Sequence, residues 1–163
     1  GKLKVGDEVE IRPGVKVGNK YQPLFTEIVG LQKADIDIEE ATAGGLLGVL
    51  TELDPYLTKS DALVGNVVGL PEKLPEVRDS LTLDVKLLER VVGTVGKLMP
   101  IKINETLLVN AGTLRSISTV TSVKKDRIEL KLKLPVCVEK GEKIVLSRQI
   151  AGRWHLIGFG SIC

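Results

Sequence analysis

The chain has 163 residues, of which 43% are hydrophobic and 27% charged, and its formal net charge is +2. This balance excludes an intrinsically disordered chain, which combines low hydrophobicity with a high net charge. Aromatic residues make up only 3% of the chain, which excludes an aromatic platform for stacking nucleic-acid bases. No apolar run reaches the roughly 20 residues that span a bilayer.

The two cysteines, Cys137 and Cys163, are too few for a disulfide framework. The first residues do not resemble a secretory signal. We therefore expect a cytoplasmic protein with reduced thiols.

Charge is distributed unevenly along the chain. Residues 1–80 hold 9 Lys and Arg against 14 Asp and Glu, whereas residues 81–163 hold 14 against 7. The change follows a segment in which Pro71 and Pro75 interrupt any strand or helix. We predict two domains, residues 1–80 and residues 81–163.

Apolar and polar residues alternate over several short segments, which is typical of half-buried strands. These segments are residues 8–12, 81–87, 128–134 and 144–146. Glycine-containing turns separate them, and many short strands with frequent turns indicate barrels or sandwiches. The predicted class is all-β.

Two segments have features of a short helix. Asp54 followed by Pro55 suits the start of a short helix, with Asp54 as its cap. Residues 87–92 fit either one side of a short helix or a strand, and the alternation before them favours a strand.

A similar turn enters a strand in both halves, in Gly6-Asp-Glu-Val-Glu-Ile11 and Gly141-Glu-Lys-Ile-Val-Leu146. Recurrent hairpin chemistry explains this similarity without any relationship between the halves. The alternative is a tandem pair of related β-barrels.

No catalytic or metal-binding constellation is recognisable. A phosphate-binding loop and a dinucleotide fingerprint are both missing. One histidine, His155, and two distant cysteines do not give a zinc spacing, and Cys137 is expected to be a small core residue. The acidic residues 35–40 alternate with isoleucine, which favours a solvated strand face over a cation site. Whether the chain is part of an enzyme stays open on these residues.

The second half concentrates basic residues, which suits either contact with a phosphate backbone or an ordinary soluble surface. They include Lys124, Lys125, Arg127, Lys131, Lys133, Lys140, Lys143, Arg148 and Arg153. In the first half, the glycines of residues 42–48 would let another molecule approach the backbone, or would simply form a turn.

The segment Leu3-Lys-Val-Gly-Asp-Glu-Val-Glu-Ile-Arg-Pro-Gly14 resembles the second domain of translational GTPases, the elongation factor Tu superfamily. Residues 53–69, 87–93 and 135–150 are similar to the gamma subunit of translation initiation factor 2. Arg153-Trp-His-Leu-Ile-Gly-Phe-Gly160 matches the final strand of that family, and residues 123–130 resemble its archaeal form.

The resemblance implies a fragment with two tandem antiparallel β-barrels, the first missing its opening strand or strands. The family's GTP-binding domain would precede them, and GTP and magnesium would bind there and not in this fragment. The implied function is translation initiation, in a factor that binds methionyl-initiator tRNA and delivers it to the small ribosomal subunit.

By the same resemblance, the tRNA acceptor end would lie over the loop of Ala43, Gly44, Gly45 and Leu46, with Gln32 near the terminal adenosine. Leu47 is expected to pack in the barrel core. The sequence departs from the family pattern at Ala43, Leu50 and Arg78, where Pro, Gly and an aromatic residue are usual. These departures put tight binding of the acceptor end in question.

The resemblance also implies partner subunits. The alpha subunit would dock on the first barrel, with residues 15–21 as one candidate contact, and the beta subunit would dock on the GTP domain. Two alternatives remain: a fragment of another tRNA-delivery GTPase, such as the selenocysteine-specific elongation factor, or a protein-interaction scaffold that does not bind RNA.

Overall fold

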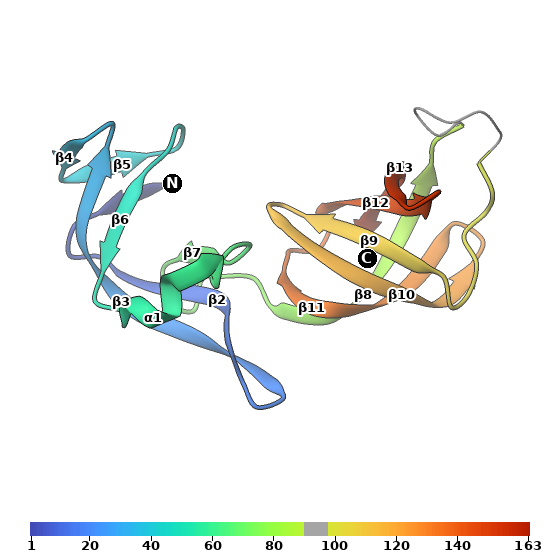
Figure 1. The fold of residues 1–163 in the computed structure, drawn as a ribbon, viewed down its shortest axis with the longest axis horizontal. Coiled ribbons are helices and arrows are strands. Elements are labelled where there is room, and N and C mark those ends of the chain that lie inside the picture. The colour runs from blue at the N-terminus through green and yellow to red at the C-terminus, as the bar shows by residue number, and fades with distance from the viewer. Residues whose placement is uncertain (90–97) are drawn as a thin grey trace. The chain divides into compact units, whose positions relative to one another are not determined.

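The computed structural model describes residues 1–89 and 98–163. Within these residues the chain is almost entirely β-structure and separates into two compact units, Gly1–Leu74 and Pro75–Cys163 (Figure 1). Every strand pairing is antiparallel. The predicted all-β class is confirmed.

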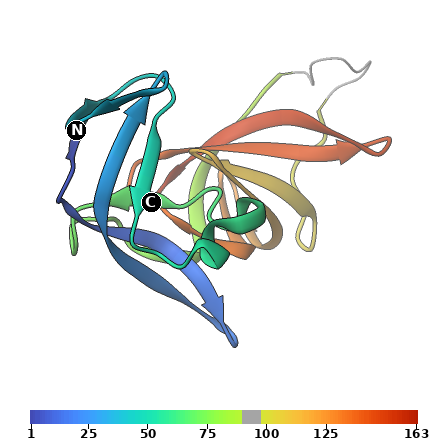
Figure 2. The same cartoon turned by 60° about the vertical axis from the view of Figure 1, so that its left-hand side comes forward.

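The first unit is a curled sheet that does not close. Its main sheet has the strand order β4-β3-β2-β7, with β6 also paired to β3, while β1 and β5 form a separate pair. The long hairpin of β2 and β3 protrudes beyond the rest of the unit in both views (Figures 1 and 2). The prediction of an incomplete first barrel is therefore confirmed. The elements are β1 (Lys2–Lys4), β2 (Glu8–Val17), β3 (Lys20–Lys33), β4 (Ile36–Ile38), β5 (Glu40–Thr42), β6 (Gly48–Thr51), α1 (Pro55–Thr58), η1 (Lys59–Asp61) and β7 (Val67–Gly69).

The second unit is a closed barrel of six strands in the order β10-β11-β8-β13-β12-β9. The strands are β8 (Val77–Leu87), β9 (Thr106–Ala111), β10 (Leu114–Lys124), β11 (Arg127–Cys137), β12 (Lys143–Ile150) and β13 (Arg153–Ile162). The predicted strand of residues 81–87 is confirmed, but its favoured continuation into residues 87–92 is wrong for Leu88 and Glu89, because β8 ends at Leu87. Residues 90–92 of the segment with the helical alternative lie outside the described residues.

Apolar residues from alternate strand positions fill the second barrel. Leu83, Leu107, Ile144 and Leu146 are fully buried there. Gly158 lets β13 lie close to its partner strand β8, because a Cβ at this position would lie 2.4 Å from the Lys86 carbonyl oxygen. The alternation visible in the sequence thus places one face of each strand in the core.

The predicted helix cap and the predicted turn glycines are confirmed. The Asp54 side chain accepts a hydrogen bond from the Tyr56 amide at 2.9 Å and caps α1. Gly6 and Gly141 have φ angles of 86° and 84°, which their turns require. Neither of the described helices is long and apolar enough to cross a membrane.

The two cysteines are free thiols. Cys137 was expected in the core, but it is only half-buried, and its Sγ lies 3.1 Å from the Pro75 carbonyl oxygen. The core position belongs to Val136 instead, which has the same parity as the buried residues Ile128 and Leu130 of β11. Alternation therefore places Cys137 on the opposite face of the strand.

Glu10 is the main exception to the predicted alternation in the first unit. Although it alternates with Val9 and Ile11, its side chain is 1% exposed. Its carboxylate accepts hydrogen bonds from Arg12 Nε at 2.5 Å and from the Glu72 amide at 2.9 Å. Arg12 Nη1 in turn donates to the Leu74 carbonyl oxygen at 2.9 Å. The segment after β7 therefore covers the face of β2 that the sequence pattern assigns to solvent.

We expect the first unit to lose stability in acid through Glu10. Burial acts to raise the pKa of Glu10, but the hydrogen bonds from Arg12 and from the Glu72 amide outweigh it, so the pKa lies below its ordinary value. A carboxyl with a lowered folded-state pKa stabilises the protein above its unfolded pKa of about 4.3. This stability is lost as pH falls through the folded-state pKa.

Chemical denaturation of the wild-type chain and of Glu10→Gln between pH 7 and pH 3 measures this contribution. The difference in unfolding free energy between the two should be constant near neutral pH and shrink below pH about 4.3. A difference that stays constant to pH 3 would show that Glu10 is not the titrating group.

Candidate nucleic-acid interface

Gln32 lies near the end of β3, between two partner strands. On one side it is paired with Asp37 of β4 and on the other with Gly48 of β6. Ala34 and Asp35 form the turn between β3 and β4 with φ angles of 50° and 62°. Two consecutive residues with positive φ are typical of a two-residue hairpin turn, which fixes the register that brings Gln32 opposite Asp37.

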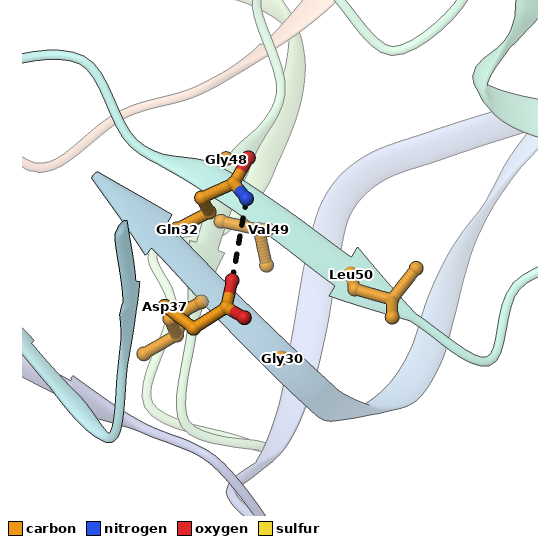
Figure 3. Close-up of a pocket in the computed structure, with 7 residues that line it drawn as sticks. Gly30, Gln32, Asp37, Gly48, Val49 and Leu50 are labelled. Atoms are coloured by element: carbon orange, nitrogen blue, oxygen red, sulfur yellow. Dashed lines mark hydrogen bonds between the residues drawn. The ribbon is translucent and has the colours of Figure 1, made fainter. Parts of the chain in front are cut away.

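The Gln32 and Asp37 side chains meet directly. Gln32 Nε2 donates a hydrogen bond to Asp37 Oδ1 at 3.2 Å (Figure 3). Both side chains remain accessible to solvent. An exposed polar pair of this kind is available to a ligand.

A pocket of about 330 Å³ surrounds this pair. Its lining consists of residues 30–32, Asp37 and residues 48–50. Leu50 supplies an apolar wall on the same face of the sheet as Gln32 and is 62% exposed. Gly30 lies beneath Leu50, because a Cβ on Gly30 would be 3.6 Å from the Leu50 Cβ. The pocket thus combines one apolar side with one polar pair, as small-molecule and nucleobase sites do.

The glycine loop, residues 43–46, runs from β5 toward β6 beside this pocket. Gly44 and Gly45 have φ angles of 112° and 81°, where residues with side chains are strained. Lys33 Nζ lies 3.5 Å from the Gly44 carbonyl oxygen, so the end of β3 contacts the loop. Leu46 is 92% exposed, whereas Leu47 packs against the buried core of the unit, as predicted.

The predicted site residues fall into two neighbouring groups. Gln32 lines the pocket, whereas Ala43, Gly44, Gly45 and Leu46 form the adjacent loop and are not part of the pocket wall. Sequence reasoning did not single out Lys33, which connects the two groups, or Asp37, which was assigned to a solvated strand face. Ala-Asp is not one of the dipeptides that signal a two-residue turn, so nothing in the sequence indicates that Asp37 pairs with Gln32.

The departures from the family pattern have different structural settings. Leu50 forms the apolar wall of the pocket. Ala43 is exposed in the loop. Arg78 lies on β8 in the second unit, where its Nη2 is 3.6 Å from a Glu76 carboxylate oxygen.

Among the described residues, no group of three or more His, Cys, Asp or Glu side chains is arranged to hold a metal ion. Of the acidic residues 35–40, Asp37 and Glu40 instead engage polar partners. Glu40 forms ion pairs with Lys2 and Lys4, and their hydrogen bonds lower the pKa of Glu40.

The second unit matches a family model described as "Initiation factor eIF2 gamma, C terminal", over residues 79–162. This match covers more than half of the chain. The chain belongs to the eIF2 gamma family.

Two archaeal members of the eIF2 gamma family show the extent of the similarity. The chain is 58% identical to translation initiation factor 2 subunit gamma of Pyrococcus abyssi, and 58% identical to that of Pyrococcus furiosus. Each alignment covers 99% of this chain and 41% of the relative. The chain therefore spans about two fifths of the length of these relatives.

A solved structure shares the fold. The chain superposes on a bacterial selenocysteine-specific elongation factor, EF-Sec, with a TM-score of 0.70 and 20% sequence identity. The superposition covers 99% of this chain and 23% of that protein. At this identity the likeness concerns the arrangement of strands.

Several of the basic residues in this eIF2 gamma chain are paired with acidic side chains. Arg127 bonds to Asp84 and Lys131 to Asp79, and Arg148 is held against Glu105. The remaining members of the basic set form no ion pair within the described part of the chain; these are Lys124, Lys125, Lys133, Lys140, Lys143 and Arg153. Fewer positive charges are therefore available to a partner than the number of basic residues in the sequence suggests.

Proposed function

We propose that this chain acts in translation initiation, as part of a GTP-dependent factor that binds methionyl-initiator tRNA and delivers it to the small ribosomal subunit. The observation that carries the proposal is the similarity to gamma subunits along 99% of the chain. The printed name of these relatives is translation initiation factor 2 subunit gamma. GTP and magnesium would bind in the part of the relatives that this chain does not cover, and the factor would work in the cytoplasm.

The glycine loop and the neighbouring pocket are the proposed contact for the tRNA acceptor end. Gly44 and Gly45 have no side chains, so a ribose and phosphate can approach the loop backbone closely. A Cβ on Gly44 would meet no atom within 4 Å, so the space beside it is open. Lys33 adds a positive charge next to this opening, which favours a phosphate.

Binding measurements on the complete subunit, with GTP bound, test this function. We expect Gln32→Ala to weaken the binding of methionyl-initiator tRNA about tenfold, since base contacts contribute about 1–3 kcal/mol. Glu52→Ala serves as the matched control, because Glu52 follows β6 outside the pocket. If the subunit binds an alpha subunit but shows no affinity for this tRNA, the scaffold function replaces the proposal.

Partner subunits are part of the proposal. The alpha subunit would dock on the first barrel, and the beta subunit on the GTP domain. Residues 15–21 form the tip of the β2–β3 hairpin, where Val17 is 53% exposed. An exposed apolar residue at a protruding tip supports this hairpin as one alpha-subunit contact.

The unpaired basic residues of the second unit predict a salt-sensitive interaction. We expect the affinity of the complete subunit for small ribosomal subunits to fall about tenfold between 50 and 200 mM salt, because released counterions drive contacts with RNA phosphates. Filter binding across this range measures it. Lys133→Gln together with Lys140→Gln should flatten the slope, and Lys131→Gln, which removes a residue paired with Asp79, should flatten it less. A slope near zero in the wild-type subunit would assign these residues to solubility alone.

A further inference from the structure

The hydrogen bond between Gln32 and Asp37 fixes how the Gln32 amide is oriented. A carboxylate can only accept hydrogen bonds, so the Gln32 nitrogen, and not its oxygen, must face Asp37. The distance of 3.2 Å from Nε2 to Oδ1 agrees with this assignment. In Figure 3 the Gln32 oxygen points away from Asp37. Asp37 therefore determines which end of the amide serves as donor and which as acceptor.

The other edge of the Gln32 amide is available to a ligand. Within the described residues, the bond to Asp37 is the one hydrogen bond that the Gln32 side chain makes. Its Oε1 and its second N–H remain, and together they form an acceptor and a donor side by side. Leu50 lines the same pocket on the Gln32 face of the sheet and offers an apolar surface to a flat ring.

We propose that Asp37 is a positioning residue that makes this pocket selective for a 6-aminopurine over a 6-oxopurine. Along its Watson–Crick edge, adenine is read by a glutamine amide through two hydrogen bonds, one from the exocyclic amine to the amide oxygen and one from the amide N–H to N1. In the same pose hypoxanthine places its O6 against Oε1, so two acceptors face each other. Hypoxanthine carries a proton on N1, so an amide that turned over would donate to O6 and accept from N1–H. Asp37 prevents this rotation.

This inference rests on the proposed function, since the purine would be the terminal base of the bound tRNA. The pocket of about 330 Å³ is large enough for one base with part of its ribose. The second oxygen of the Asp37 carboxylate points toward the side of the pocket where Gly30 and Leu50 lie (Figure 3). It adds a further acceptor and reinforces the preference for an amino group.

The test compares methionyl-initiator tRNA that ends in adenosine with the same tRNA ending in inosine. We expect the complete wild-type subunit to bind the adenosine end about tenfold more tightly. Asp37→Asn keeps the shape of the side chain but can also donate a hydrogen bond, so Gln32 can be held in either orientation. The preference should fall to less than about twofold, mainly through tighter binding of the inosine end.

Asp35→Asn is the matched control, because it removes the same charge from the turn beside Asp37 without touching the pocket. It should keep the tenfold preference. Equal binding of the two ends by the wild-type subunit would overturn the inference, as would an unchanged preference in Asp37→Asn. These outcomes leave the proposed function standing as long as Gly45→Val weakens tRNA binding. A subunit that binds neither tRNA rejects the proposed function and this inference together.

Discussion

Replacing Glu10 with leucine is expected to lower the free energy of unfolding of the first unit by about 3–5 kcal/mol. Glu10 is 1% exposed and receives hydrogen bonds from Arg12 and from the Glu72 amide. Its removal leaves the Arg12 guanidinium without its carboxylate partner and the Glu72 amide without its acceptor. The loss is costly at the Glu72 amide, whose acceptor was buried, and at Arg12, whose side chain is only 23% exposed.

Urea denaturation measures the change in the free energy of unfolding. Hydrogen exchange at the Glu72 amide measures how easily the segment over β2 opens. Glu8→Leu is the control, since Glu8 lies on the same strand but is exposed. Replacing both charges, in Glu10→Leu with Arg12→Met, should recover part of the loss, because it also removes the Arg12 charge that has lost its carboxylate partner. If Glu10→Leu costs no more than Glu8→Leu, the buried pair does not hold the segment of residues 70–74 against β2.

Gly45→Val in the complete subunit is expected to weaken the binding of methionyl-tRNA by tenfold or more, with GTP affinity unchanged. Gly45 has a φ angle of 81°, and left-handed backbone costs a residue with a side chain about 1–2 kcal/mol. A Cβ would also lie 3.4 Å from Lys33 Cε, so the two methyl groups of valine would add bulk beside the contact between Lys33 and the loop. The loop would then leave the conformation that exposes its backbone to the acceptor end.

Gly112→Val separates this effect from general strain. Gly112 also has positive φ, at 54°, and has open space around its missing Cβ, but it lies in the turn between β9 and β10 of the second unit. Both variants should lose stability, and only Gly45→Val should lose tRNA affinity. Equal tRNA affinities for wild type and Gly45→Val would remove the glycine loop from the binding site.

The strands were predictable from the sequence, because burying one face of a strand makes apolar and polar residues alternate with a period of two residues. Leu83, Ile128 and Leu130 are buried at the positions that the alternation selects. Glu10 is buried although alternation predicts that it faces solvent, because the segment of residues 70–74 folds back over its side of β2. Alternation along one strand cannot predict a contact with a segment so distant in sequence. Cys137 was misassigned because it follows Val136 in an apolar stretch, although the alternation that buries Val136 places Cys137 on the opposite face of β11.

The candidate site was predictable only in part. The glycines of residues 43–46 were visible as a backbone signal, and the positive φ angles of Gly44 and Gly45 agree with it. The role of Asp37 depends on strand register, and the contact of Lys33 with Gly44 depends on how the loop returns to the sheet. Both are tertiary relations between residues that have no distinctive pattern in sequence.

Crosslinking with a photoreactive adenosine at the 3′ end of methionyl-initiator tRNA tests the central claim most directly. The label should attach to the complete, GTP-bound subunit within residues 30–50, which contain both the pocket and the glycine loop. Unlabelled methionyl-initiator tRNA should compete for this crosslink. Attachment only outside the first unit, in a sample that binds the tRNA, would contradict the account.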